Sequence, residues 1–107
     1  MNAADKYGWT ALIWASLNGP KEVVQMLLNV EGINVNAANK NGDTALIMAS
    51  RLGHKEVVQI LLKFEGIDVN AADNYGSTAL MWASYYDYKE VITMIKMHKD
   101  NINLHCR

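Results

Sequence analysis

Three side chains that could bind a metal ion lie near the end of the 107-residue sequence: His98, His105 and Cys106. Imidazole and thiolate groups are ligands that zinc prefers, and a structural zinc site takes four of them. No second group of histidine or cysteine residues is present in the sequence to complete such a site. We therefore expect no metal centre, and we interpret these residues as part of a C-terminal tail.

Residue patterns for catalysis are also missing from the sequence. It contains no phosphate-binding loop, no dinucleotide-binding glycine pattern and no paired histidines of the metalloprotease type. Asp43, Asp68, Asp73 and Asp87 are scattered without the pairing that general acid–base catalysis uses. The sequence therefore predicts a protein that is not an enzyme and that needs no cofactor.

The composition excludes further classes of function. The formal net charge is −1 at pH 7, so we expect neither nucleic acid nor an acidic membrane surface as a partner. No apolar run approaches the roughly eighteen residues of a membrane-spanning helix. The single cysteine, Cys106, excludes an internal disulfide and fits a reducing compartment, which predicts an intracellular protein of the cytoplasm or nucleus.

The elements that must position any functional side chain follow from an internal repeat. A segment that contains Thr-Ala-Leu begins at residue 5 and recurs from residues 39 and 73, with a period of 34. Residues 5–38 and 39–72 are identical at 23 of 34 positions. We therefore divide the single domain 1–107 into repeats at 5–38, 39–72 and 73–107, and we interpret residues 1–4 as the end of a preceding repeat.

Each repeat predicts a turn, a short helix, a break, a second helix and an extended return. Thr10, Thr44 and Thr78 suit the N-cap of the first helix, because a hydroxyl oxygen can accept the unpaired N–H groups there. The second helix carries one apolar stripe and is too short to fold alone, so it must pack against a neighbouring repeat. In the third repeat we expect residues 102–104 to form the extended return.

These residues resemble the ankyrin repeat family. The matching pattern is Asp/Asn-x-x-Gly-x-Thr-x-Leu in each repeat, followed in the middle one by Gly53-His54, Glu-Val-Val, Leu-Leu and Gly-Ile-Asp-Val-Asn-Ala. The resemblance implies an all-α repeat solenoid, in which three ankyrin-like helix–turn–helix units are joined by β-hairpin-type turns. It also implies a role in binding other proteins.

The sequence departs from the family pattern at two points. The family's Thr-Pro-Leu-His is Thr-Ala-Leu-Ile in the first two repeats and Thr-Ala-Leu-Met in the third. One extra residue after the leucine pair lengthens the family's period of about 33 to 34. Since the histidine is replaced, we expect Ile13, Ile47 and Met81 to make apolar contacts between neighbouring helices instead of hydrogen bonds.

In the family, the turn tips and one face of the first helix line a concave surface that binds partner proteins. Transferred to this sequence, that surface comprises 18 positions, and seven of the nine aromatic residues fall on them. Tyrosine and tryptophan often anchor protein interfaces. We therefore predict a non-enzymatic protein-interaction module with an aromatic-rich concave face. The predicted partner-binding residues are Tyr7, Trp9, Trp14, Leu17, Arg51, Leu52, Tyr75, Trp82, Tyr85 and Tyr86.

Two of these predicted residues have a second interpretation. A tryptophan on a helix face can belong to the core as well as to a binding surface, because its large apolar ring suits both. For Trp14 and Trp82 the sequence leaves both interpretations open.

A self-assembling scaffold is the alternative function. Stacked repeats need polar outer faces, and the first repeat has none. The third repeat resembles a cap, because Lys96 replaces Leu28 and Leu62 of the earlier repeats. The uncapped N-terminal repeat could pair with another molecule and give a homodimer or an end-to-end stack.

One asparagine resembles a modification site of the family. Ankyrin asparagines that follow Asp-Val are targets of an asparaginyl hydroxylase, and Asn70 follows Asp68-Val69. Asn36 follows Asn34-Val35 and matches less well. The simpler interpretation is that these asparagines brace the hairpins through side-chain hydrogen bonds.

Overall fold

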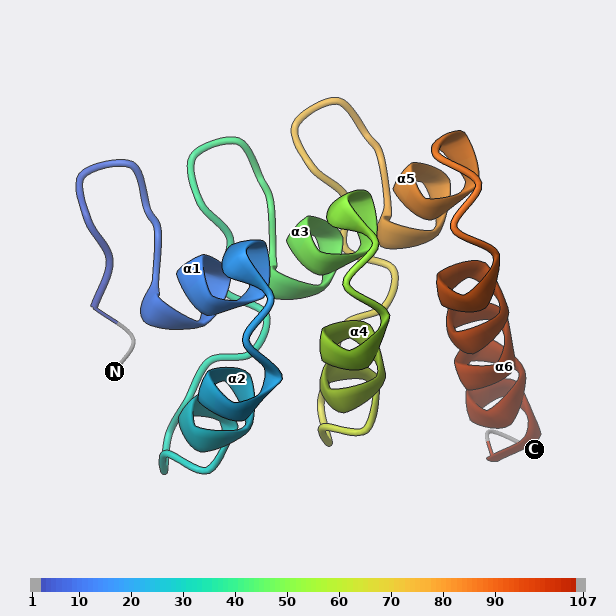
Figure 1. Cartoon of the computed structure of the whole chain (residues 1–107), viewed down its shortest axis with the longest axis horizontal. Helices are drawn as coiled ribbons and strands as arrows, with labels where there is room; N and C mark the ends of the chain where they lie inside the picture. The colour runs from blue at the N-terminus through green and yellow to red at the C-terminus, as the bar shows by residue number, and fades with distance from the viewer. Residues whose placement is uncertain (1–2, 106–107) are drawn as a thin grey trace.

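The computed structural model describes residues 3–105 of the chain, and the side chains of residues 3–98. Its helices, in order, are α1 (Ala11–Asn18), α2 (Lys21–Leu28), α3 (Ala45–Leu52), α4 (Lys55–Leu62), α5 (Ala79–Tyr85) and α6 (Lys89–His105). They form three pairs that stand side by side, with α1, α3 and α5 in one row and α2, α4 and α6 in the other (Figure 1). Between residues 3 and 105 there is no strand, only isolated antiparallel bridges from Ala38 to Thr44 and from Ala72 to Thr78. The predicted all-α repeat solenoid is confirmed.

The first helix of each pair begins where the sequence provides a hydroxyl cap. The Oγ1 atoms of Thr10, Thr44 and Thr78 accept hydrogen bonds from the backbone N–H three residues on, at 3.2, 3.1 and 3.2 Å. α1 and α3 each end at a glycine in the left-handed conformation, with φ of 86° and 74°. After α5 the corresponding residue is Asp87, with φ of 60°, and aspartate tolerates this conformation better than most side chains.

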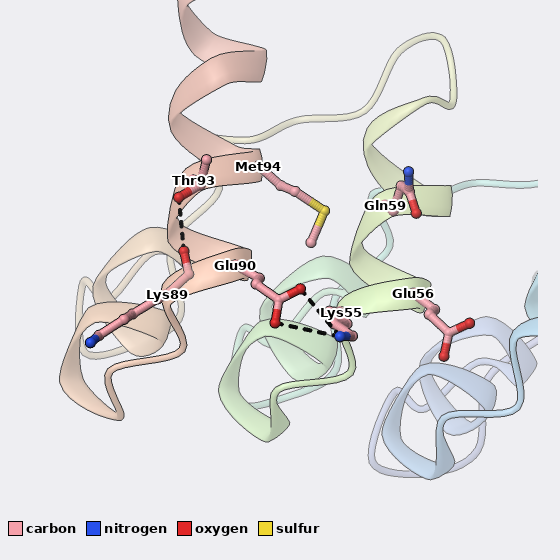
Figure 2. Close-up of a pocket in the computed structure, with 7 residues that line it drawn as sticks. All are labelled: Lys55, Glu56, Gln59, Lys89, Glu90, Thr93 and Met94. Atoms are coloured by element: carbon pink, nitrogen blue, oxygen red, sulfur yellow. Dashed lines mark hydrogen bonds and ion pairs between the residues drawn. The ribbon is translucent and has the colours of Figure 1, made fainter.

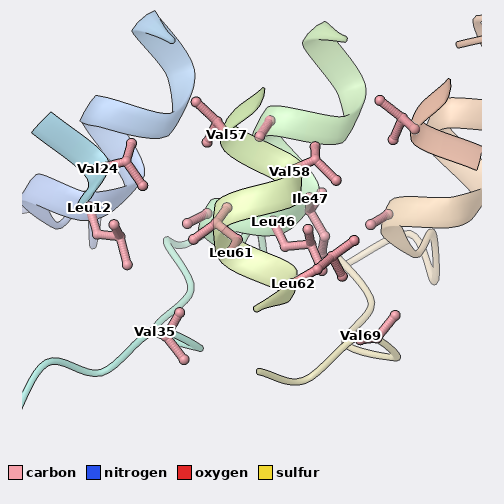
Figure 3. Close-up of a cluster of buried hydrophobic side chains, with 14 of the residues drawn as sticks. Leu12, Val24, Val35, Leu46, Ile47, Val57, Val58, Leu61, Leu62 and Val69 are labelled. Carbon is pink, nitrogen blue, oxygen red and sulfur yellow. The ribbon is translucent and has the colours of Figure 1, made fainter. Parts of the chain in front are cut away.

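Aliphatic side chains from every helix pair form one continuous core. Figure 3 shows the central part of this core, with helix side chains lying above Val35 and Val69 of the returning loops. Removing a side chain such as Leu46 from water contributes about 1.5–3 kcal/mol. The largest fully buried side chains include Leu12, Ile13, Leu46, Ile47, Met48, Leu61, Ile95, Val24, Val57, Val58 and Val91.

The residues that replace the family's histidine divide into two groups. Ile13 and Ile47 are fully buried, and their helices α1, α3 and α5 pack side by side, which agrees with the predicted apolar contacts. The prediction is wrong for Met81, which is 57% exposed. The physical reason is its position, because no described helix packs on the side of α5 that carries Met81.

The third repeat also differs at its end. The predicted extended return at residues 102–104 is wrong, because α6 continues as a helix to His105. In the first two repeats, Gly32 and Gly66 turn the chain after the second helix with φ of 79° and 91°. The equivalent position of the third repeat is Asp100, so the glycine that reverses the chain is missing there.

Neighbouring hairpin tips are tied to one another through their backbones. The N–H of Lys40 donates to the carbonyl of Tyr7 at 2.9 Å, and the N–H of Asn74 donates to the carbonyl of Asn41 at 3.0 Å. Gly42 permits this approach, because a Cβ atom on it would lie 2.8 Å from the Asn74 nitrogen. The hairpins therefore form a row of tips held in fixed register above α1, α3 and α5 (Figure 1).

Candidate functional site

Most of the predicted partner-binding residues lie on one surface of the molecule. It is formed by the turn residues 6–9, 40–43 and 74–77 and by the adjoining sides of α1, α3 and α5, and we call it the hairpin face. Two hollows lie on this face, one of about 220 Å³ and one of about 490 Å³. Trp82 lines both, so the two hollows adjoin each other.

The smaller hollow, which we call the central pocket, receives side chains from all three repeats. Its walls combine aromatic rings with charged groups. The lining residues are Trp9, Asn41, Asp43, Arg51, Asp73, Tyr75 and Trp82. Four of these belong to the predicted partner-binding set, so the fold brings together residues that are far apart in the sequence.

Asp73 is the best-satisfied charged group of the central pocket. Its Oδ1 accepts hydrogen bonds from the backbone N–H of Tyr75 at 3.0 Å and of Ser77 at 2.9 Å. Its Oδ2 accepts a hydrogen bond from the indole Nε1 of Trp82 at 2.9 Å. Burial alone would raise the pKa of the Asp73 carboxyl, but these donors stabilise the anion and hold the pKa below its ordinary value.

Asp43 is in the opposite situation. Its only salt bridge joins Oδ2 to the Arg51 guanidinium at 3.3 Å, and its buried Oδ1 has no hydrogen-bond partner among the described residues. Burial raises the pKa of the Asp43 carboxyl above its ordinary value, and the nearby Arg51 charge only partly offsets this shift. The central pocket therefore contains one carboxylate with three hydrogen-bond donors and one whose single partner among the described residues is Arg51.

Arg51 connects the middle repeat to the third. Its guanidinium lies 5.2 Å from the ring centroid of Trp82, within the range of a cation–π interaction. Its Nη2 also lies 3.0 Å from the sulfur of Met48. Arg51 was predicted as a surface contact, but the structure places it in the wall of the central pocket, between Asp43 and Trp82.

The larger hollow, which we call the terminal hollow, lies at the third repeat. It is lined by Ser77, Met81, Trp82, Tyr85 and Tyr86. Trp82 and Tyr86 stack with their planes 13° apart and their centroids at 6.1 Å, and Tyr85 lies edge-on to both. These mutual contacts hold the rings in place while much of their surface stays exposed.

The first repeat contributes a second aromatic group. The rings of Trp9 and Trp14 lie 4.6 Å apart between centroids, tilted by 32°. Lys6 and Lys40 place their ammonium groups 5.1 and 5.9 Å from the ring centre of Tyr7. This end of the hairpin face is therefore aromatic and basic, whereas the central pocket beside it is acidic.

The two tryptophans that the sequence left open have different positions. Trp14 is 46% exposed and lies outside the buried cluster, whereas Trp82 packs against that cluster and also lines both hollows. Of the remaining predicted residues, Leu17 is half-buried and Leu52 is exposed, and neither lines a hollow.

Sequence reasoning missed the acidic residues of the central pocket. It treated Asp43 and Asp73 as scattered, because their proximity depends on how one repeat packs on the next. One signal was available for Asp73, since an aspartate at the start of the turn favours side-chain hydrogen bonds to the N–H groups that follow.

A third hollow, of about 460 Å³, lies between the second helices α4 and α6 (Figure 2). Its charges are balanced, because two lysines and two glutamates line it. Lys55 and Glu90 pair across it at 3.2 Å, and the Thr93 hydroxyl donates to the backbone carbonyl of Lys89 at 2.9 Å. No predicted partner-binding residue lines this hollow.

Other chemistry has little support in the described part of the chain. No three His, Cys, Asp or Glu side chains gather there as metal ligands, and no helix there is long and apolar enough to cross a membrane. Of the tail residues considered for metal binding, Cys106 and the His105 side chain lie outside the described residues. The ring of His54 lies 3.0 Å from the Leu17 carbonyl oxygen, so it connects two repeats.

Comparison with models of protein families decides the family. A model described as ankyrin repeats in three copies matches residues 30–106, and a model of the single ankyrin repeat matches residues 7–40. The chain belongs to the ankyrin repeat family. A search of curated proteins found no match to it.

Ankyrin repeats are generally modules that bind other proteins, and the family is typically non-enzymatic. Membership therefore agrees with the absence of a catalytic pattern from this sequence. In this ankyrin repeat protein the exposed tyrosine and tryptophan side chains of the described residues lie on the hairpin face, which makes that face the candidate site.

Proposed function

We propose that this chain is a protein-interaction module that binds its partner through the hairpin face. The observation that carries the proposal is that aromatic side chains from the first and third repeats border two adjoining hollows on that face. The proposed anchors are Trp9, Tyr75, Trp82, Tyr85 and Tyr86. The partner is another protein, and the single cysteine fits an encounter inside the cell, in the cytoplasm or nucleus.

Aromatic anchors suit this role for two reasons. Truncating a tyrosine or tryptophan at the centre of an interface costs about 2 kcal/mol or more. The rings here are already held by stacking and by the Trp82–Asp73 hydrogen bond, so binding orders few further side chains and loses little entropy.

The test uses two rings that are exposed and contribute little to the core. In a pull-down quantified by mass spectrometry, we expect the double variant Tyr75→Ala/Tyr85→Ala to capture about ten-fold less partner protein than the wild-type chain captures. Its thermal unfolding midpoint should stay close to that of the wild type. Met26→Ala, an exposed apolar side chain on α2, is the matched control and should capture the partner normally. Equal capture by the double variant would contradict the proposal.

Self-association through the first repeat is a second candidate function. Val23 of α2 is 43% exposed, whereas the equivalent Val57 of α4 is 1% exposed within the stack. An apolar position that other repeats bury is thus open in the first repeat. Sedimentation over a concentration series tests this candidate: association that Val23→Glu abolishes supports it, and a monomer at every concentration excludes it.

Asn70 remains a proposed hydroxylation site. The equivalent Asn36 is held on both sides, because its Nδ2 donates to the Gly66 carbonyl and its Oδ1 accepts from the Asp68 N–H, both at 2.8 Å. The bracing role predicted for these asparagines therefore applies to Asn36. The Asn70 side chain is exposed, which supports it as the more accessible target for a modifying enzyme.

A further inference from the structure

The central pocket contains more negative than positive charge. Asp43 and Asp73 are 3% and 7% exposed, and Arg51 is the one cationic side chain that lines the pocket with them. When all three are ionised, their net charge is −1. Charges that are buried away from water interact more strongly than charges in bulk solvent. The net negative charge of the pocket therefore favours the binding of a cation.

Asp43 also has an oxygen that the described residues leave without a partner. All three donors around Asp73 are in place, whereas the Asp43 carboxylate binds only Arg51 among the described residues and its Oδ1 accepts no hydrogen bond from them. A buried carboxylate oxygen without a donor is unfavourable. The Arg51 contact of 3.3 Å is longer than an ordinary N–H···O bond, so the one partner of the Asp43 carboxylate is a weak one.

The remaining walls of the pocket also suit a cation. Trp9, Tyr75 and Trp82 surround the charged groups, and the faces of aromatic rings attract cations. Tyr75, which lines the pocket, is itself 90% exposed, so the pocket extends to the surface of the molecule. At about 220 Å³ the pocket matches the end of one long side chain rather than a folded segment.

We propose that the central pocket binds a basic side chain, the guanidinium of an arginine or the ammonium of a lysine, presented by the partner protein. The inference rests on the proposed function and gives it a chemical requirement. An added cation brings the charge of Asp43, Asp73, Arg51 and the ligand to zero. It also supplies the missing donor to Asp43 and lies against the aromatic walls.

The rest of the hairpin face is less suited to a basic side chain than the central pocket is. Lys6 and Lys40 lie at the ring of Tyr7, so a partner cation is repelled from that end of the face. The terminal hollow has aromatic and methionine walls and no carboxylate among its lining residues. The central pocket is therefore the place on this face where a desolvated carboxylate and aromatic rings occur together.

The test uses small probes and the intact chain. N-acetyl-arginine methylamide and N-acetyl-lysine methylamide are titrated against the ¹⁵N-labelled protein, and the indole N–H signal of Trp82 is followed by NMR. The uncharged N-acetyl-citrulline methylamide, which has nearly the same shape as the arginine probe, is the matched control. We expect saturable shifts with at least one cationic probe and about ten-fold weaker binding of the citrulline probe. Equal binding of the citrulline probe, or no shift with either cation, overturns the proposal.

Two variants separate charge from folding. Asp43→Asn should weaken binding of the cationic probe about five-fold, whereas Asp68→Asn, at an exposed position, should not change it. Arg51→Gln removes the internal cation and should tighten binding, a direction that structural damage does not produce. Unchanged binding in Arg51→Gln overturns the proposal even if Asp43→Asn fails to fold. If the probes fail while Tyr75→Ala/Tyr85→Ala still loses the protein partner, this inference falls and the proposed function stands.

Discussion

Trp14 and Trp82 occupy equivalent positions in the first and third repeats, but their surroundings differ. Trp14 rests on Trp9, is nearly half exposed and makes no hydrogen bond within the described residues. Trp82 packs against the core, donates to Asp73 and lies beneath the Arg51 guanidinium. Trp14 is thus a surface residue that contacts Trp9, whereas Trp82 connects the core to the hairpin face.

A neighbouring position accounts for much of this difference. Asp5 and Asp73 are equivalent, and each accepts two backbone N–H groups of its own hairpin. Four residues after each aspartate, the first repeat has a tryptophan and the third has a serine. The small serine leaves the Trp82 indole free to reach Asp73, whereas in the first repeat Trp9 covers Trp14. The same residue type at equivalent positions of two repeats therefore takes its role from the side chains around it.

The two tryptophans should differ most in what they contribute to stability. Trp82→Ala should lower the free energy of unfolding by about 3 kcal/mol, because it opens a space at the core and leaves Asp73 without its indole donor. Trp14→Ala should cost less than about 1 kcal/mol, because Trp14 is largely exposed. Urea unfolding followed by circular dichroism measures both values. Similar losses in the two variants would mean that Trp14 is as much a part of the scaffold as Trp82.

A smaller effect concerns pH, because the two aspartates of the central pocket respond in opposite directions. The folded-state pKa of Asp73 lies below its ordinary value of 3.8, so this group stabilises the fold above that pH and loses its contribution as pH falls through the folded-state pKa. The folded-state pKa of Asp43 is raised, so its contribution is complete below 3.8 and is lost as pH rises through the folded-state pKa.

Unfolding free energies measured from about pH 2.5 to 7 test this prediction. Relative to the wild type, Asp73→Asn should become less stable as the pH rises, whereas Asp43→Asn should become more stable over the same range. Asp68→Asn serves as the control at an exposed position. Parallel pH profiles for the two pocket variants would show that the carboxylates share one environment.

The sequence was sufficient to predict the features that depend on local residues and on the period. The threonine caps and the apolar stripes follow from side chains close together in the chain, and the aromatic bias of the hairpin tips follows from aligning the repeats. The end of α6 was predicted wrongly, although the sequence held a signal for it, because a glycine present in the first two repeats is replaced by Asp100.

Features that depend on packing between repeats could not be predicted from the sequence. Met81 matches Ile47 in the sequence, and only the absence of a described helix beside it makes it exposed. Arg51 and Trp82 contact each other across a repeat boundary, and no sequence motif relates two residues so far apart in the chain. The central pocket therefore appears only when the hairpins are placed in register.

A substitution of Trp9 tests whether this residue keeps the Trp14 indole from Asp5, and its effect on stability should be small. Trp9→Ser gives the first repeat the residue found at the equivalent position of the third, and it should allow the Trp14 indole to donate to Oδ2 of Asp5, the oxygen equivalent to the one that Trp82 reaches on Asp73. The new hydrogen bond contributes about 1 kcal/mol and the lost ring contact removes a similar amount, so stability should change little. Hydrogen exchange of the Trp14 indole N–H, followed by NMR, should slow in Trp9→Ser and stay unchanged in Trp9→Phe, which keeps a ring. Unchanged exchange in Trp9→Ser would mean that Trp9 does not cause the difference between Trp14 and Trp82. The cause would then be Arg51 of the middle repeat, which lies over the ring of Trp82.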